Sequence, residues 1–257
     1  MNSIPILYED TDVLVINKPA GLIVHSDGRT HEPTVVDWIL HTHPEIKGVG
    51  ENKEAERSGL VHRLDRDTSG AMVVAKTQKA FEFLKKQFQT REVEKIYHAF
   101  VYGKMKQDEG VIDRSIARSK RGGALWSATR GKKGKEREAV TEYRVLARFQ
   151  GQSLESKDSV QDSPWFTFLE MRPLTGRTHQ LRVHLKAINY PVVCDKLYAP
   201  NRGCPLGFSR LALHARSLTL ALPPLRQGYA GQANGKEIKI EAPYPEDFEK
   251  ALSFTDT

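Results

Sequence analysis

Apolar residues along the chain fall into short blocks that predict strands more often than helices. In residues 4–18, two apolar stretches lie on either side of the polar segment 9–12, which is typical of two short strands joined by a turn. Pro19 and Gly21 follow directly and would end the second strand. We therefore expect a strand pair near the N-terminus.

Similar apolar blocks predict five further strands, at residues 71–75, 95–102, 165–171, 211–222 and 237–241. Residues 79–89 have the apolar spacing of an amphipathic helix. A second helix would begin after Thr178, as its N-terminal cap, and stop before Pro191. Many strands, few helices and no internal repeat indicate an α+β fold around a central mixed, mainly antiparallel sheet.

A chain of 257 residues with 39% apolar content can bury a sizeable core, either as one larger domain or as two closely packed lobes. We expect a single domain of two lobes over residues 1–257. Two segments without periodicity are expected at its surface. They are residues 41–58, and residues 223–235, which look like a polar, glycine-rich insertion.

The net charge of +7 and the isoelectric point near 9.3 favour a polyanionic partner. Much of the positive charge lies in residues 114–137, where lysines and arginines occur among glycines around Trp126. We interpret this segment as an exposed basic loop that contacts RNA, because cations bind phosphates and aromatic rings stack on bases. A solvated surface without a partner is the alternative. The residues expected to contact RNA are Lys120, Arg121, Lys132 and Lys133.

The sequence predicts neither a targeting leader nor a membrane span. The N-terminal residues lack a charged and then apolar leader, and no apolar run approaches the roughly 20 residues that cross a bilayer. Cys194 and Cys204 lack the paired spacing of a zinc or redox site, so we expect reduced thiols. These features favour a cytoplasmic protein.

Charged residues crowd between two apolar blocks in residues 59–70, and loops held by strands often carry chemistry. Asp65 lies between Arg63 and Arg66, whose positive charge would favour its ionised form. An ionised carboxylate could act as a nucleophile or as a base. A surface network of ion pairs is the alternative interpretation.

Two further segments carry candidate residues. Residues 176–184 place Arg177, His179 and Arg182 at the start of the second predicted helix, whose N-terminal amides can bind anions. A solvated helix face is the alternative there. Tyr97 lies within a predicted strand, where an aromatic residue ordinarily belongs to the core.

Three motifs occur in a fixed order along the chain. They read H-R-L-D-x-x-T-S-G at residues 62–70, Lys-x-Tyr at 95–97 and G-R-T-H-Q-L-R-V-H at 176–184. Together with residues 6–25 and 242–248, they resemble the RluA-type pseudouridine synthase family over nearly the whole chain. The resemblance implies the pseudouridine synthase fold and an enzyme that isomerises uridine in RNA.

The family resemblance also implies roles for individual residues. Asp65 would be the catalytic carboxylate, and Arg63 would fill the stack that the target base leaves. Tyr97 would stack on the flipped uracil, and Arg182 would pair with Asp65. Leu181 would pack in the catalytic pocket.

The resemblance also assigns Arg177 and His179 to the binding of RNA. The implied reaction breaks the N-glycosidic bond, rotates the retained uracil and rejoins it through carbon, with no metal or redox cofactor. Whether Asp65 attacks the sugar or first removes a proton is left open.

The expected partner is structured RNA, either ribosomal RNA or tRNA, bound by a monomer without a membrane. Many relatives carry an N-terminal S4-type RNA-binding domain, whereas this chain resembles members without one. RNA selection is therefore expected to rest on the catalytic domain itself.

Other classes of function fit the sequence less well. A protein kinase needs H-R-D with a downstream asparagine, which residues 62–65 do not spell, and an aspartic protease needs a second matching aspartate. A non-catalytic RNA-binding protein remains the alternative from another class. An RNA glycosylase would release a base and a nuclease would break the strand, whereas the formation of pseudouridine conserves the mass of the RNA.

Overall fold

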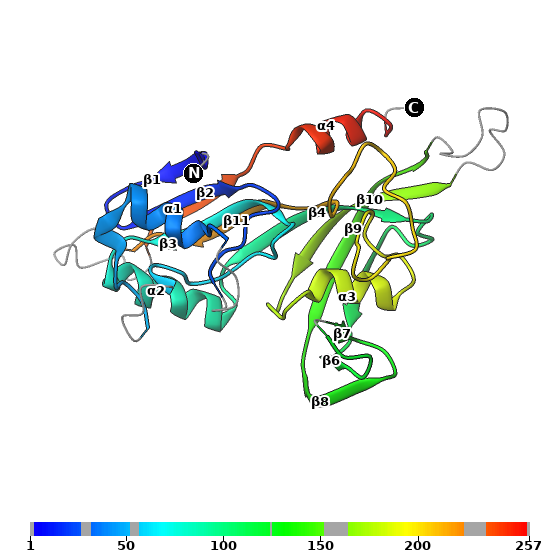
Figure 1. The fold of residues 1–257 in the computed structure, drawn as a ribbon, viewed down its shortest axis with the longest axis horizontal. Helices are drawn as coiled ribbons and strands as arrows, with labels where there is room; N and C mark the ends of the chain where they lie inside the picture. The colour runs from blue at the N-terminus through cyan, green and yellow to red at the C-terminus, as the bar shows by residue number, and fades with distance from the viewer. Residues whose placement is uncertain are drawn as a thin grey trace. The chain divides into compact units, whose positions relative to one another are not determined.

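The computed structural model describes residues 3–26, 32–51, 57–123, 125–151, 164–223 and 235–255. The chain forms two compact units (Figure 1). The first unit contains Met1–Lys95 and Ala215–Pro243, and the second contains Ile96–His214 and Tyr244–Thr257. Strands β4 (Glu94–Tyr102) and β11 (Leu213–Ala221) each include residues of both units. The chain therefore passes from one unit to the other within these two strands.

The first unit is built on a sheet in the order β1-β2-β3-β11-β12. The strands that join β11 there are β1 (Ile6–Glu9), β2 (Val13–Lys18), β3 (Ser69–Ala75) and β12 (Glu237–Glu241). Strands β2 and β3 pair antiparallel, with Val15 opposite Val73, and every residue of β3 is buried. The strand pair near the N-terminus and the amphipathic helix, α2 (Gln78–Thr90), are confirmed.

Helix α1 (Val35–Thr42) in the first unit was not predicted. Thr34 accepts a hydrogen bond from the Asp37 amide, and the Asp37 side chain accepts one from the Thr34 amide, which forms a capping box. The predicted surface loop at 41–58 therefore starts inside a helix. It also contains a 3-10 helix, η1 (Pro44–Ile46), whose Ile46 is fully buried. The loop prediction is wrong for these described parts, and residues 52–56 lie outside the described chain.

The second unit contains an antiparallel sheet in the order β4-β10-β9-β5. Its strands besides β4 are β5 (Glu109–Asp113), β9 (Val140–Gln150) and β10 (Trp165–Pro173). Phe100 of β4 stacks on Phe168 of β10 with ring centroids 4.6 Å apart, and it also contacts Phe248 of helix α4 (Glu246–Leu252). The α+β prediction is confirmed, although β5, β9 and α4 were not predicted.

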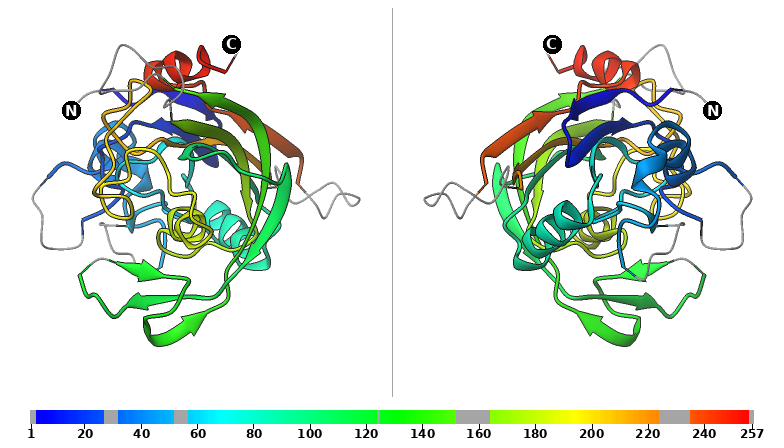
Figure 2. Two further views of the ribbon diagram at one scale, coloured as in Figure 1. Left: turned by 90° about the vertical axis from the view of Figure 1, so that its right-hand side faces the viewer. Right: turned by 90° about the vertical axis from the view of Figure 1, so that its left-hand side faces the viewer.

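Helix α3 (Gln180–Ala187) lies on the concave side of the curved strands of this sheet (Figure 2). Leu181 and Leu185 are buried in the core of the second unit. The predicted cap at Thr178 is wrong, because His179 occupies the cap position with a positive φ of 55° and no capping side chain. The buried Gln180 side chain instead accepts a hydrogen bond from the Arg177 amide at 3.0 Å.

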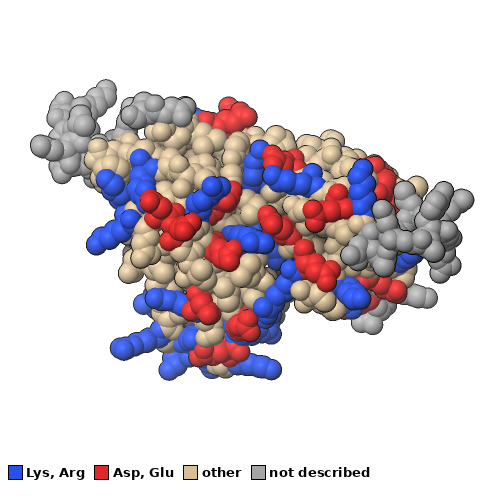
Figure 3. All heavy atoms as spheres, turned by 180° about the vertical axis from the view of Figure 1, so that it is seen from behind, with Lys and Arg blue, Asp and Glu red and all other residues tan. Residues whose placement is uncertain are grey.

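The predicted basic loop at 114–137 is instead a small antiparallel sheet in the order β7-β6-β8. Its strands are β6 (Ile116–Ser119), β7 (Trp126–Ser127) and β8 (Lys132–Arg137). Residues beneath it form an apolar cluster that includes Val183 of α3, and this cluster stabilises the sheet. Lys and Arg side chains project from it at the lower end of the view in Figure 3. We call residues 116–137 the basic sheet.

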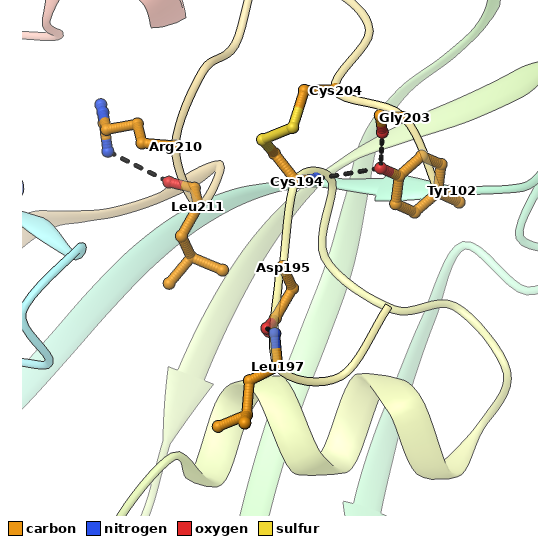
Figure 4. Close-up of a disulfide and its surroundings, with 8 residues drawn as sticks. All are labelled: Tyr102, Cys194, Asp195, Leu197, Gly203, Cys204, Arg210 and Leu211. Atoms are coloured by element: carbon orange, nitrogen blue, oxygen red, sulfur yellow. Dashed lines mark hydrogen bonds between the residues drawn. A yellow bond between two sulfur atoms is a disulfide. The ribbon is translucent and has the colours of Figure 1, made fainter. Parts of the chain in front are cut away.

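The two cysteines form a disulfide, Cys194–Cys204, so the expectation of reduced thiols is wrong for this structure (Figure 4). The chain turns back on itself between them, which brings their Cα atoms to 4.6 Å. Most of the predicted 223–235 insertion lies outside the described residues. Its flanks are joined, because the Leu222 amide donates to the Lys236 carbonyl at 2.9 Å. Among the described helices, none has the length and apolar character to span a membrane.

Candidate active site

The predicted site residues are divided between the two units. The first unit holds Arg63 and Asp65. The second unit holds the other predicted residues, which are Tyr97, Lys120, Arg121, Lys132, Lys133, Arg177, His179, Leu181 and Arg182. The expected pair of Asp65 with Arg182 joins residues of different units and stays a prediction.

Asp65 lies in a short turn before β3. Its carbonyl accepts a hydrogen bond from the Thr68 amide at 3.2 Å, and its side chain is half-buried. The loop that carries it begins at Gly59, where φ is +72° and a Cβ would lie 2.6 Å from the Ala75 carbonyl oxygen. It ends at Gly70, where φ is +115° and a Cβ would lie 2.2 Å from the Ala215 carbonyl oxygen. Glycine is therefore required at both ends of this loop, residues 59–70, which we call the aspartate loop.

A fully buried lysine ties the aspartate loop to the end of β2. The Lys18 ammonium donates to the carbonyls of Pro19 and Leu22 at 2.8 Å and to that of Arg66 at 2.9 Å. The Arg66 carbonyl also accepts from the Gly21 amide at 2.9 Å. Because hydrogen bonds from a charged donor are strong, this arrangement fixes the chain one residue beyond Asp65.

His62 anchors the other side of the loop. Its Nε2 accepts a hydrogen bond from the Val73 amide at 3.0 Å, and its ring stacks on Phe88 at 4.6 Å. An accepting Nε2 requires the neutral ring with the proton on Nδ1. Burial lowers the pKa of His62 to about 3, with a smaller effect of the Lys95 charge, which agrees with a neutral ring.

The two arginines beside Asp65 bind other partners. Arg63 donates to Nε2 of His25 at 3.1 Å, while Nδ1 of His25 donates to the Ser26 carbonyl. Arg66 donates to the Gly21 carbonyl and to Glu32. Their predicted electrostatic effect on Asp65 therefore stays a prediction. His25 was not predicted as a site residue.

Tyr97 lies in β4 opposite Met171 of β10. Its ring is half-buried and packs against the large apolar core of the second unit. Tyr97 therefore combines a packing role with a partly exposed surface.

Arg182 of α3 forms the best-defined ion pair of the candidate site. Its Nε and Nη2 each lie 2.8 Å from a carboxylate oxygen of Asp195. The Asp195 side chain is 0% exposed, and Arg182 is 11% exposed. Sequence analysis missed Asp195, because an isolated aspartate 13 residues beyond Arg182 has no motif to mark it.

The remaining residues of the third motif are held by neighbours in the second unit. Arg177 donates from Nε to the Glu138 carbonyl at 3.0 Å. His179 forms a hydrogen bond through Nδ1 with the Tyr198 hydroxyl at 2.9 Å. Leu181 is buried in the main core. The structure thus brings Arg177, His179, Leu181 and Arg182 together around the start of α3.

The four predicted RNA contacts in the basic sheet are not equivalent. Lys120, Arg121 and Lys133 are exposed. Lys132 is half-buried and binds Glu136 at 2.5 Å and the Ser115 hydroxyl at 2.8 Å. Its charge is therefore partly neutralised within the protein.

An arginine and an aromatic ring lie together on the basic sheet. The Arg118 guanidinium lies 4.6 Å from the centre of the Trp126 ring. Such a pair offers both a cation and a flat apolar surface. Within the described chain, no group of three His, Cys, Asp or Glu residues is arranged to hold a metal ion.

Comparison with known proteins identifies the family. Residues 12–187 match the family described as RNA pseudouridylate synthase. A relative from Synechocystis named an RNA pseudouridine synthase is 37% identical over 249 residues, which cover 97% of this chain and 68% of the relative. Ribosomal large subunit pseudouridine synthase D of Pseudomonas aeruginosa is 38% identical over 262 residues, which cover 96% of this chain and 70% of that protein.

Solved structures share the fold. Human RNA pseudouridylate synthase domain containing 4 has a TM-score of 0.68 at 25% identity, covering 98% of this chain and 93% of that chain. Human RNA pseudouridylate synthase domain containing 1 has the same TM-score at 24% identity, covering 95% and 84%. The chain belongs to the RNA pseudouridylate synthase family, whose members are isomerases that act on RNA. The RluA-type resemblance and the predicted fold are confirmed.

Proposed function

We propose that the protein isomerises specific uridines of structured RNA to pseudouridine, with Asp65 as the catalytic carboxylate. The observation that supports this proposal is that the aspartate loop, which carries Asp65, is held firmly in place in a member of this family. Lys18 and His62 hold the loop on both sides of Asp65 through main-chain groups. Loops fixed in this way place a functional group accurately on a rigid scaffold.

The proposed reaction conserves all atoms. The bond from C1′ of the ribose to N1 of uracil breaks, the base rotates, and a bond from C1′ to C5 forms. The proton on C5 leaves, and N1 gains a proton. Asp65 acts either as the nucleophile at C1′ or as the base that removes a sugar proton, and the target base must leave the RNA stack in both cases.

The second unit supplies the groups that would hold the detached base. We propose that Tyr97 stacks on the uracil, that Leu181 forms an apolar wall, and that Arg182 pairs with Asp65. Arg177 and His179 would bind the RNA near the start of α3, where helix amides favour phosphate. Arg63 would fill the stack left by the flipped base.

The basic sheet is the proposed RNA-binding surface. Lys120, Arg121 and Lys133 are exposed and would contact phosphates, and Lys132 would contribute less because of Glu136. Large-subunit ribosomal RNA is the preferred substrate over tRNA, because relatives such as the one from Pseudomonas aeruginosa are named for it. We propose that residues 1–257 act as one catalytic domain, as a monomer in the cytoplasm and without a cofactor.

Nucleoside analysis tests the proposed activity. Unmodified transcripts of large-subunit ribosomal RNA and tRNA are incubated with the wild type, Asp65→Asn and Asp67→Asn. Pseudouridine is then measured by mass spectrometry after a pseudouridine-specific derivatisation. Asp67, an exposed carboxylate two residues away, provides the matched control. We expect product from the wild type and Asp67→Asn and none from Asp65→Asn.

Other products would contradict the proposal in distinct ways. Tight RNA binding without pseudouridine would favour a non-catalytic RNA-binding protein. Loss of a base or breakage of the strand would indicate a glycosylase or a nuclease. Activity on tRNA alone would contradict the preference for ribosomal RNA while leaving the reaction intact.

A further inference from the structure

Asp195 is a fully buried carboxylate with every oxygen engaged. Oδ2 accepts from Nε of Arg182 at 2.8 Å, and Oδ1 accepts from Nη2 of Arg182 at 2.8 Å. Oδ1 also accepts from the amides of Leu197 and Tyr198 at 3.0 Å. A carboxylate without exposed surface is stable in a protein only when it is paired and hydrogen-bonded in this manner.

This contact determines the orientation of the Arg182 guanidinium. The group is planar and carries five N–H donors in a fixed arrangement. Two parallel hydrogen bonds to one carboxylate fix both the position and the plane of the guanidinium. The directions of its other donors are therefore fixed as well, including those at Nη1.

The loop that carries Asp195 is itself restrained. The disulfide Cys194–Cys204 closes it (Figure 4). The Tyr102 hydroxyl accepts from the Cys194 amide at 3.0 Å and donates to the Gly203 carbonyl, so it joins both ends of the loop. The position of Asp195 is therefore set by its own loop and does not depend on Arg182.

Tyr198 connects the same loop to the basic sheet. Its ring centre lies 5.0 Å from the Arg182 guanidinium carbon, and its hydroxyl accepts from the Trp126 amide at 3.1 Å. The hydroxyl also binds His179 at 2.9 Å. One loop thus contacts the proposed catalytic arginine, the start of α3 and the proposed RNA-binding surface.

We infer that Asp195 is a positioning residue for the isomerisation, which aims Arg182 without touching the RNA. The inference rests on the proposed function, because it assigns Asp195 a role through Arg182. Misplacing a catalytic group by about 1 Å can cost roughly 100-fold in rate. Loss of the carboxylate should therefore slow the chemical step more than it weakens RNA binding.

Asp195→Asn is a conservative test of this role. The amide keeps an oxygen that can accept from Leu197 and Tyr198, but it loses the charge and the second acceptor for Arg182. Asp247→Asn is the matched control, because Asp247 forms the same two-bond pair with Arg210 at 2.7 and 2.8 Å in the same unit. Single-turnover rates and RNA dissociation constants are measured for both variants on an RNA that the wild type modifies.

We expect Asp195→Asn to lower the single-turnover rate about 10- to 100-fold with less than about a threefold change in Kd, and Asp247→Asn to keep the wild-type rate. The double variant Arg182→Lys/Asp195→Asn separates positioning from general stability. Lysine cannot make the two parallel bonds, so adding Asp195→Asn to Arg182→Lys should change the rate less than about threefold. A wild-type rate for Asp195→Asn, or fully additive losses in the double variant, would overturn the inference.

Two controls keep the result unambiguous. If Asp195→Asn does not fold by circular dichroism, Asp195→Glu takes its place, since it keeps the charge but displaces the carboxylate by one methylene. A folded Asp195→Glu with the wild-type rate would also overturn the inference. Failure of the wild type to form pseudouridine would instead refute the proposed function, which distinguishes the two outcomes.

Discussion

The aspartate loop and helix α3 are held in place in different ways. The aspartate loop is fixed by main-chain groups, since Lys18 donates to three carbonyls and His62 accepts from one amide. Helix α3 is held through its own side chains, which bind both main-chain and side-chain groups of other segments, above all in the pair of Arg182 with Asp195. Main-chain anchors tolerate changes in neighbouring side chains, whereas side-chain anchors depend on each partner. We therefore expect stability to depend most on the anchors of the first region, and rate on those of the second.

The largest effect on stability is expected for Lys18→Met. The change keeps the apolar stem but leaves the carbonyls of Pro19 and Leu22 without this donor. Hydrogen bonds from a charged group contribute about 1.5–3 kcal/mol each, so the loss of these bonds from the fully buried Lys18 should lower the free energy of unfolding by roughly 3–5 kcal/mol. Urea unfolding measures the change, with Lys86→Met on the exposed side of α2 as the control. Equal losses in both variants would refute the main-chain anchor.

The next effect concerns the disulfide beside α3. Its cysteines are 10 residues apart, and closing a loop of this length stabilises a protein by about 3 kcal/mol. Treatment with dithiothreitol should lower the unfolding temperature of the protein. The Cys194→Ser/Cys204→Ser variant should show a decrease of the same size, because both changes remove the disulfide. Titration of free thiols in the untreated, denatured protein should detect none. Two free thiols would show that the bond does not form in solution.

A smaller, pH-dependent effect is expected for His62 in the aspartate loop. Its pKa is about 3 in the folded protein and near 6.5 when unfolded. The unfolded state therefore binds the proton first, so the stability present above pH 6.5 is lost as the pH falls toward 3. The loss is at most about 1.4 kcal/mol per pH unit, or roughly 2 kcal/mol between pH 6.5 and 5.

His62→Gln should flatten this pH dependence in urea unfolding. The slope that remains is assigned in part to His184 of α3, whose pKa burial also lowers. His184 lies between the Thr141 hydroxyl and the Arg114 carbonyl, each at 3.0 Å. An unchanged slope in His62→Gln would contradict the role of neutral His62 as an anchor of the aspartate loop.

The smallest effect of each single substitution is expected for RNA binding by the basic sheet. Lys120→Glu/Lys133→Glu should weaken RNA binding about tenfold at low salt and reduce the dependence of Kd on salt concentration. Lys47→Glu/Lys86→Glu, with exposed lysines of the first unit, should change binding less. Filter binding at several salt concentrations compares the pairs. Equal weakening would show that overall charge, rather than the basic sheet, attracts the RNA.

Patterns within short stretches of sequence predicted those elements that depend mainly on neighbouring residues. Apolar spacing located α2 and α3, and the contiguous motif at 62–70 located the aspartate loop. The basic sheet escaped prediction because its short strands are largely exposed, and its order comes from the cluster around Val183 beneath it. Helix α1 escaped although the capping pair of Thr34 and Asp37 is visible in the sequence.

The parts of the candidate site that were missed depend on long-range contacts. Asp195 acquires its partner only when the chain beyond α3 folds back beside that helix. The cysteines likewise pair because of a turn that no spacing motif signals. Lys18 reads as the polar end of a strand, and only the structure shows its ammonium buried against the aspartate loop.

The most direct test of Asp65 as the catalytic carboxylate follows the hydrogen on C5 of uracil. The new bond from C1′ replaces the bond from C5 to hydrogen, so isomerisation must release that hydrogen to water. Large-subunit ribosomal RNA transcripts labelled with tritium at C5 of uridine are incubated with the wild type and with Asp65→Asn. Our account predicts tritium release by the wild type, in a fixed ratio to the target uridines, and none by Asp65→Asn. Release at the same rate by both proteins would contradict it.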